Sequence, residues 1–190
     1  MKNNHTWVIC AYGESEFLEA CILSLQAQTL PSKIICYSST PLDSIKQLCQ
    51  KYGIPFYTKE GGGIGKDWNN ALSFVETSYA TIAHQDDYYE PTYLEAVMQK
   101  IEQSKAILIA YPDYFEEKNG VKIPANTNLK IKTLMLKTLN LMPSSRFWRN
   151  RVLAFGNPIS CPAVTYNLET LRDFRFDEEL SLIHIWRCRR

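Results

Sequence analysis

The sequence predicts an α/β fold in which a doubly wound, mostly parallel β-sheet carries helices on both faces. Short apolar segments alternate with longer segments of helical periodicity through the first 111 residues. The connections are long enough for the right-handed helical crossovers that parallel strands require. Glycine, serine or acidic residues follow the apolar segments, at the carboxyl edge where such a sheet binds ligands.

The first strand and helix are predicted from residues 6–25. Thr6–Tyr12 (TWVICAY) is an apolar run that ends at Gly13. The residues after it are apolar at helical spacing, and nearby glutamates suit the positive amino-terminal end of that helix. The apolar positions are Phe17, Leu18, Cys21, Ile22 and Leu25.

The second strand is predicted at Lys33–Ser39 (KIICYSS). A helix follows it, because Thr40 suits the N-cap, Pro41 suits the first helical position, and Gly53 suits the end. The apolar stripe of this helix is Ile45, Leu48, Cys49 and Tyr52.

Three more strands complete the predicted sheet. A short third strand, Ile54–Tyr57, leads into the glycine-rich loop Glu60–Gly65 (EGGGIG) and a third helix. The fourth strand, Tyr79–Ala83, runs toward two adjacent acids, and a helix separates it from a fifth strand at Ala106–Tyr111. The helices are marked by Trp68, Ala71, Leu72 and Val75, and by Leu94, Val97, Met98 and Ile101.

The regular alternation ends after Tyr111. Asn119-Gly120 predicts a hairpin turn between two short strands. Helices are expected at 131–141 and 146–155, and Cys161–Tyr166 (CPAVTY) is expected to return as a strand.

Length and composition fit one globular domain, which we expect to span residues 1–179. The chain has 190 residues, of which 45% are hydrophobic and 22% charged. The net charge is +1, and three terminal arginines supply more than that, leaving −2 (1 − 3) for the rest. No basic face indicates a nucleic-acid partner.

Cysteine usage and hydropathy indicate a cytoplasmic protein. The six cysteines include no Cys-x-x-Cys pair, which favours reduced thiols. The amino terminus does not resemble a signal peptide, and no apolar run approaches the roughly 20 residues of a membrane span. We expect a soluble protein or one at the periphery of a membrane.

The stretch His84–Pro91 (HQDDYYEP) carries the clearest candidate site. Asp86 and Asp87 follow the fourth strand, and paired carboxylates are the hard oxygen ligands that Mg²⁺ or Mn²⁺ prefers. The alternative is a solvated loop or a helix cap, but the position at a strand end favours the metal. His84 is either a further ligand or a hydrogen-bonded wall residue.

The glycine-rich loop does not match a known phosphate motif. In EGGGIGKD, Glu60 replaces the first glycine of the Walker pattern and Asp67 replaces its Ser/Thr. No GxGxxG follows the first strand, so dinucleotide binding is weakly supported. The glycines form either an irregular surface turn or a close backbone approach to a nucleotide.

These motifs, in their order, resemble glycosyltransferase family 2, whose members are inverting enzymes with the type A glycosyltransferase fold. The resemblance covers roughly residues 5–180. It rests on VICAYGESEFLEACILSLQAQTL, GIGKDWNNAL, HQDDYYEP and NPISCPAVTYNLETLRDFRFDEEL. It implies a metal-assisted transfer of a sugar from a nucleoside diphosphate donor, a UDP-sugar, to the hydroxyl of a glycan or lipid-linked acceptor, in surface-glycan synthesis.

The resemblance also implies which residues bind the donor. The family has an acid after its second strand, and this chain has serines there, so they are the candidates for the nucleoside. The implied donor-binding residues are Ala11, Tyr12, Ser38, Ser39, Gly65, Asp67 and Asp86.

The resemblance assigns the metal to Asp86 and Asp87, with His84 in place of an acid often found there. A bound Mn²⁺ or Mg²⁺ offsets charge on the leaving diphosphate. A carboxylate base then deprotonates the acceptor. The family carries this base after the Phe-Asp-Glu segment, so we expect it beyond Glu179, where this chain has no acid.

The last residues, Leu180–Arg190 (LSLIHIWRCRR), match a back-translated transposase-end sequencing adapter if TGA is read as Trp. We therefore expect 180–190 to be a non-native tail and the natural domain to continue differently. The alternative is a genuine basic strand facing an anionic membrane.

Three functions remain open from the sequence. The first is the glycosyltransferase, acting in the cytoplasm at the inner face of the membrane. The second is a catalytically incomplete module that binds a nucleotide sugar or a carbohydrate. The third is a metal-dependent phosphoester hydrolase, which also suits paired aspartates but lacks a second acidic cluster.

Overall fold

The computed structural model describes residues 4–104, 108–112, 115–118 and 121–179. The predicted tail at 180–190 lies outside the described residues. The described residues form two compact units. The first unit combines residues up to Ala110 with those from Val164, and the second unit is Tyr111–Ala163.

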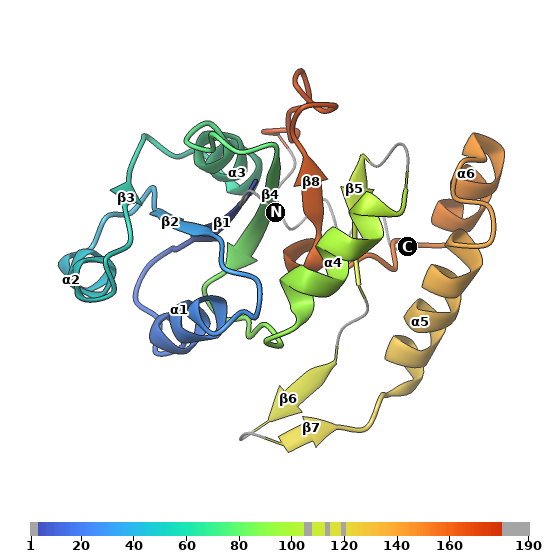
Figure 1. The fold of residues 1–190 in the computed structure, drawn as a ribbon, viewed down its shortest axis with the longest axis horizontal. Coiled ribbons are helices and arrows are strands. Elements are labelled where there is room, and N and C mark those ends of the chain that lie inside the picture. The colour runs from blue at the N-terminus through green and yellow to red at the C-terminus, as the bar shows by residue number, and fades with distance from the viewer. Residues whose placement is uncertain (1–3, 105–107, 113–114, 119–120, 180–190) are drawn as a thin grey trace. The chain divides into compact units, whose positions relative to one another are not determined.

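The first unit is a six-stranded sheet with four helices (Figure 1). Its strands are β1 His5–Cys10, β2 Lys33–Tyr37, β3 Phe56–Tyr57, β4 Tyr79–His84, β5 Ile109–Ala110 and β8 Thr165–Asn167. Its helices are α1 Leu18–Gln26, α2 Asp43–Lys51, α3 Ile64–Leu72 and α4 Tyr93–Glu102. The strand order is β3-β2-β1-β4-β8-β5, and the first four strands are parallel, so the predicted doubly wound α/β fold is confirmed.

One strand interrupts the parallel order. β8 pairs antiparallel with both β4 and β5, with Tyr166 opposite Ala80 on one side and Ile109 on the other. The strand predicted at Cys161–Tyr166 is therefore only partly correct. Its first three residues form the 3₁₀ turn η1 (Cys161–Ala163), where Pro162 has no amide proton for a strand ladder.

Successive side chains of β1 pack on opposite faces of the sheet. Trp7 and Ile9 are fully buried in a cluster with residues of α1, α2 and α4. Val8, between them, packs in another cluster with residues of α3. This period of two explains why the strand is apolar throughout, since helices cover both of its faces (Figure 1).

The second unit contains a hairpin and two packed helices. Its elements are β6 Glu116–Lys118, β7 Val121–Ile123, α5 Thr127–Leu139, α6 Arg146–Ala154 and η1. Lys118 pairs with Val121, so the hairpin predicted at Asn119-Gly120 is confirmed, although the two turn residues are outside the described part. α5 begins before the predicted position because the Asn126 side chain caps it, accepting from the Leu129 amide at 2.8 Å.

The cysteines in the described part of the chain are free thiols, as predicted. Cys21, Cys36 and Cys49 are buried in the core of the first unit. None of the described helices has the length and apolar character needed to cross a membrane.

Candidate functional site

The carboxyl ends of β1, β2 and β4 meet at one edge of the sheet, because the three strands are parallel neighbours. The Ala11 amide donates to the Tyr37 carbonyl at 2.8 Å, and the Gly13 amide donates to the Thr40 hydroxyl at 3.2 Å. Gly13 has φ of +65°, a conformation that glycine adopts without a steric penalty. The loops after β1 and β2 are thus joined directly.

Gln85 joins the loop after β1 to the loop after β4. The Tyr12 amide donates to Gln85 Oε1 at 3.1 Å, and Gln85 Nε2 donates back to the Tyr12 carbonyl at 2.8 Å. The Tyr12 side chain is 68% exposed, so its backbone is fixed while its ring faces solvent. The sequence does not predict this role of Gln85, because an amide side chain that pairs with a distant peptide leaves no local pattern.

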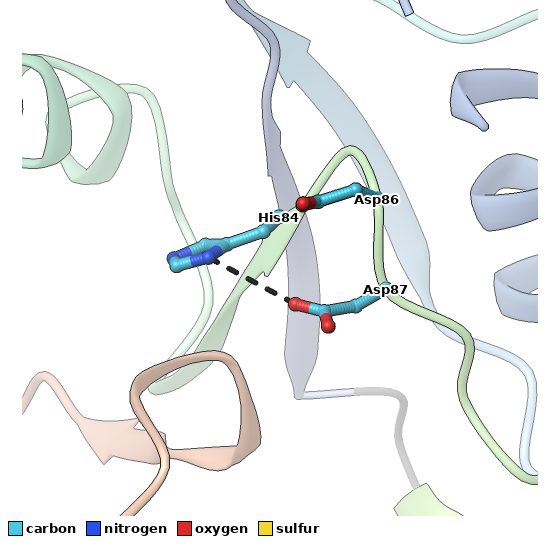
Figure 2. A group of neighbouring side chains, drawn as sticks. All are labelled: His84, Asp86 and Asp87. Carbon is cyan, nitrogen blue, oxygen red and sulfur yellow. Dashed lines mark ion pairs between the residues drawn. The ribbon is translucent and has the colours of Figure 1, made fainter. Parts of the chain in front are cut away.

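His84, Asp86 and Asp87 form a cluster at the end of β4. One potential ligand atom from each residue lies within 4.8 Å of the others. Figure 2 shows the His84 imidazole and the Asp87 carboxylate directed toward each other, with 3.8 Å between Nδ1 and Oδ2. The structure thus brings together the three residues that sequence analysis assigned to a metal.

Burial perturbs the charges of this cluster. Desolvation, with a further contribution from the negative charge of Asp86, raises the pKa of Asp87 to about 6. Desolvation lowers the pKa of His84 below its ordinary value, and the charge of Asp86 opposes this effect only in part. Near neutral pH the Asp87 side chain is therefore largely a carboxylate and the His84 imidazole is uncharged.

That arrangement fits a divalent cation. Two carboxylates supply a charge of −2 and hard oxygen donors, and the neutral imidazole supplies a nitrogen lone pair. Among the described residues, the buried Nε2 of His84 has no hydrogen-bond partner. The cluster is open on one side, since Asp86 is exposed, which leaves room for water or a ligand oxygen.

An aromatic stack fixes the plane of the His84 ring. Trp68 of α3 stacks on His84 with 5.6 Å between ring centroids, and Phe176 packs edge-on against Trp68 at 4.9 Å. As the first member of an apolar helical stripe, Trp68 is expected to pack in the core, but in the structure it is half-buried beside the cluster. A residue near the carboxyl end of the described chain therefore supports His84 through Trp68.

The first turn of α3 and the loop before it contact the end of β2 and the loop after it. Ser39 Oγ donates to Asp67 Oδ2 at 3.0 Å, and the Tyr37 hydroxyl donates to Asp67 Oδ1 at 3.4 Å. A Cβ on Gly61 would lie 2.6 Å from the Ser39 Cβ, so this position requires glycine. Ser39 and Asp67, both assigned to the donor, thus lie side by side.

The two serines after β2 have different surroundings. Ser38 is fully buried, and its Oγ accepts a hydrogen bond from the Thr40 amide at 3.1 Å. The Ser38 hydroxyl therefore stabilises the turn after β2. Ser39 is half-buried and contacts Asp67. Ser39 is therefore the better placed of the two for a ligand.

The segment Phe176–Glu178 docks on α3 through Asn69. Asn69 Nδ2 donates to the Phe176 carbonyl at 2.9 Å, and the Phe176 amide donates to Asn69 Oδ1 at 2.8 Å. Asn69 Nδ2 also contacts Glu178 Oε1 at 2.9 Å. The catalytic carboxylate is expected beyond Glu179, where this chain has no acid, and residues 180–190 lie outside the described part. The segment just before them is anchored at the candidate site.

Gly65→Ala should release this segment. An added Cβ would lie 2.2 Å from the Asp177 carbonyl oxygen, which is backbone and cannot swing away. Alanine is otherwise the better helix former, so we expect a net loss of about 1–3 kcal/mol in the free energy of unfolding and a change in Trp68 fluorescence.

Urea unfolding followed by tryptophan emission checks this result. Gly62→Ala is the matched control, because its Cβ would meet only the flexible side chain of Lys66. Equal effects of the two substitutions would contradict the close approach at Gly65.

Known glycosyltransferases are similar to this chain in sequence and in fold. Residues 6–161 match the family described as Glycosyl transferase family 2. The glycosyltransferase GlyA of Streptococcus pneumoniae serotype 4 is 24% identical over 123 residues, which are 61% of this chain and 18% of GlyA.

Solved structures share the architecture. TarS residues 1–349 from S. aureus superpose with a TM-score of 0.68 at 20% identity, covering 93% of this chain and 51% of that one. The mannosyltransferase PcManGT from Pyrobaculum calidifontis, in complex with GDP-Man and Mn²⁺, gives 0.62 at 13% identity, covering 93% and 48%. The chain thus spans about half the length of these structures, and at such identities the likeness concerns the fold.

Proposed function

The chain belongs to glycosyl transferase family 2 and has the type A glycosyltransferase fold, and from this premise we propose that it serves an inverting transfer of a sugar from a nucleoside diphosphate donor to an acceptor hydroxyl. The observation that carries the proposal is the cluster of His84, Asp86 and Asp87 at the end of a central parallel strand. The residues of 1–179 would act as one transferase domain.

The surroundings of the cluster suit a nucleotide. Tyr12 offers an exposed ring, and Ser39 and Asp67 offer polar atoms at the neighbouring strand end. TarS has been solved in complex with UDP and with UDP-GlcNAc, and PcManGT with GDP-Man and Mn²⁺. We take a UDP-sugar as the donor of this chain, with Ala11 and Tyr12 beside the base and Ser39 beside the ribose or diphosphate.

Asp86 and Asp87 would hold the cation, with His84 as a further ligand. A bound Mn²⁺ or Mg²⁺ would supply positive charge against the negative charge that builds on the leaving diphosphate. The Trp68 stack keeps His84 in one orientation, and Asp87 is half-buried. A nitrogen ligand favours Mn²⁺ over Mg²⁺, since Mg²⁺ prefers oxygen.

The acceptor side is proposed from family membership. A carboxylate beyond Glu179 in the natural protein would take the proton of the acceptor hydroxyl. The acceptor would be a glycan or a lipid-linked sugar of surface-glycan synthesis, made in the cytoplasm at the inner face of the membrane.

Calorimetric titration with UDP tests the donor site. We expect binding with Mn²⁺ present, weaker binding with Mg²⁺, and a loss of about tenfold or more in affinity when EDTA removes the metal, because the diphosphate then faces two uncompensated carboxylates. GDP under the same conditions is the control for base selection.

Affinity for UDP that is the same with and without metal would contradict the proposed site. Donor binding without sugar transfer to any acceptor would favour the binding module. Hydrolysis of a plain phosphodiester without an acceptor would favour the hydrolase instead.

A further inference from the structure

The helices of the second unit concentrate positive charge. Residues 124–163 contain six basic residues and no acidic one. They leave a net charge of −5 (1 − 6) for the rest of the chain. The six are Lys130, Lys132, Lys137, Arg146, Arg149 and Arg151. Charge of one sign over so short a segment indicates an anionic partner.

The hairpin of α5 and α6 is held together by its inner side. Leu136, Leu139 and Val152 are buried against one another, and Trp148 packs on them. The Trp148 indole donates to the Thr138 carbonyl at 2.8 Å. The two helices, which contact each other, therefore do not depend on their outer side chains for packing.

The outer side combines basic and large apolar residues. We call it the α5–α6 face and define it by Lys130, Ile131, Leu134, Lys137, Leu141, Phe147, Arg151 and Phe155, all exposed. The five apolar members are between 53% and 88% exposed, with Phe155 the most exposed. On α5, Lys130, Leu134 and Lys137 lie on one side of the helix at spacings of three and four residues. On α6, the Arg151 guanidinium lies 5.3 Å from the centre of the Phe147 ring.

A hollow of about 280 Å³ opens between the two helices. It is lined mainly by apolar side chains, among them Leu134, Trp148 and Phe155, and Arg151 contributes a guanidinium. An apolar hollow beside a cation suits an acyl chain whose headgroup carries a phosphate.

We propose that the α5–α6 face docks on an anionic phospholipid surface. Its lysines and Arg151 would meet headgroup phosphates, and Phe147 and Phe155 would enter the boundary with the acyl chains. A soluble polyanion would use the cations but would leave the exposed phenylalanines in water. An apolar protein surface would use the phenylalanines but would bury the cations without partners, which is costly.

Sedimentation with phospholipid vesicles tests the proposal on the whole chain. We expect binding to vesicles of phosphatidylglycerol and phosphatidylcholine, weak binding to phosphatidylcholine alone, and release at high salt. Lys130→Gln with Lys137→Gln should weaken binding about 30-fold, as expected for two cations near an anionic surface. Phe147→Ser with Phe155→Ser should weaken it about tenfold or more.

Lys46→Gln with Lys100→Gln is the matched control. It removes the same charge from exposed lysines of α2 and α4, and binding should stay within about twofold of the unchanged chain. All the substituted side chains are exposed, so circular dichroism should show an intact fold. If the phenylalanine pair does not fold, the lysine pair still decides the outcome.

Five results would overturn the proposal. One is equal binding to charged and uncharged vesicles, and another is an equal loss of binding in the control pair. A third is binding of soluble polyphosphate that is the same with and without Phe147→Ser and Phe155→Ser. A fourth is a dimer that these two substitutions break, in a protein that does not bind vesicles. The fifth is vesicle binding that survives the α5–α6 substitutions but is lost when Arg187, Arg189 and Arg190 become glutamine.

Discussion

Asp87→Asn should abolish metal-dependent UDP binding and make the metal-free protein more stable. The substitution removes a charged oxygen ligand, so we expect the affinity for UDP with Mn²⁺ to fall at least about 100-fold. It also removes a carboxylate that the fold disfavours, since burial and Asp86 raise the pKa of Asp87 to about 6. Loss of function with a gain in stability distinguishes a binding residue from a structural one.

The sign of the stability change follows from the pKa. A carboxyl whose pKa is higher in the folded protein than the ordinary 3.8 costs stability as the pH rises through the folded value of about 6. The uncharged amide introduced by Asp87→Asn carries no such cost at neutral pH. Because the Asp87 side chain is 38% exposed, solvent screening reduces the gain to about 1 kcal/mol.

Thermal unfolding with and without Mn²⁺ measures both effects together. A ligand at 100 times its dissociation constant stabilises the folded protein by about 2.7 kcal/mol, so the unchanged chain should melt higher with Mn²⁺ and UDP. The Asp87→Asn protein should melt higher without ligand and should not respond to it. Asp43→Asn, at an exposed carboxylate of α2, is the control and should keep the full response. A full response in Asp87→Asn would remove Asp87 from the metal site.

The sheet and its binding edge could be predicted from the sequence because their signals are local. Apolar runs such as Thr6–Tyr12 identify buried strands, and the helical spacing between them requires parallel crossovers. Once the strands are parallel, Tyr12, Ser39 and Asp86 must fall at one edge. The family resemblance added the roles of these residues, which the spacing alone does not assign.

Contacts between distant segments could not be predicted in this way. β8 enters between β4 and β5 from more than 50 residues along the chain, and its three residues carry no signal of that pairing. Asn69 and Gln85 bind backbone groups of remote loops, and an amide side chain gives no indication of which peptide it will meet. The close approach at Gly65 depends on the same kind of contact.

The role of His5 could not be predicted either. Its position near the amino terminus suggests a residue with no structural or functional role. In the structure it is 1% exposed in β1. Nδ1 lies 2.8 Å from Ser32 Oγ, and Nε2 lies 2.9 Å from Thr81 Oγ1. Since Ser32 Oγ donates to the His5 carbonyl at 2.7 Å, it accepts from Nδ1–H, and Nε2 accepts from the Thr81 hydroxyl. The neutral imidazole is therefore fully hydrogen-bonded within the core.

Lowering the pH should destabilise the protein through His5. Burial lowers the pKa of His5 from 6.5 to about 3. Between these two pH values the unfolded chain binds a proton at His5 and the folded chain does not. The stabilising contribution is complete above pH 6.5 and is lost progressively as the pH falls toward 3. Between about pH 7.5 and pH 5 the loss from this residue should be about 2 kcal/mol in the free energy of unfolding, since each pKa unit is worth 1.36 kcal/mol.

Urea unfolding of the unchanged chain and of His5→Gln at both pH values isolates this contribution. Glutamine does not titrate, so the variant should lose about 2 kcal/mol less on acidification, even if it is less stable at pH 7.5. His84 and Asp87 titrate in both proteins, and their contributions cancel in the difference. In parallel, the His5 imidazole resonance should not titrate above about pH 5. An equal pH dependence in the two proteins, or a His5 resonance that titrates near 6.5, would show that the core admits the charged ring and that its neutral network does not control acid stability.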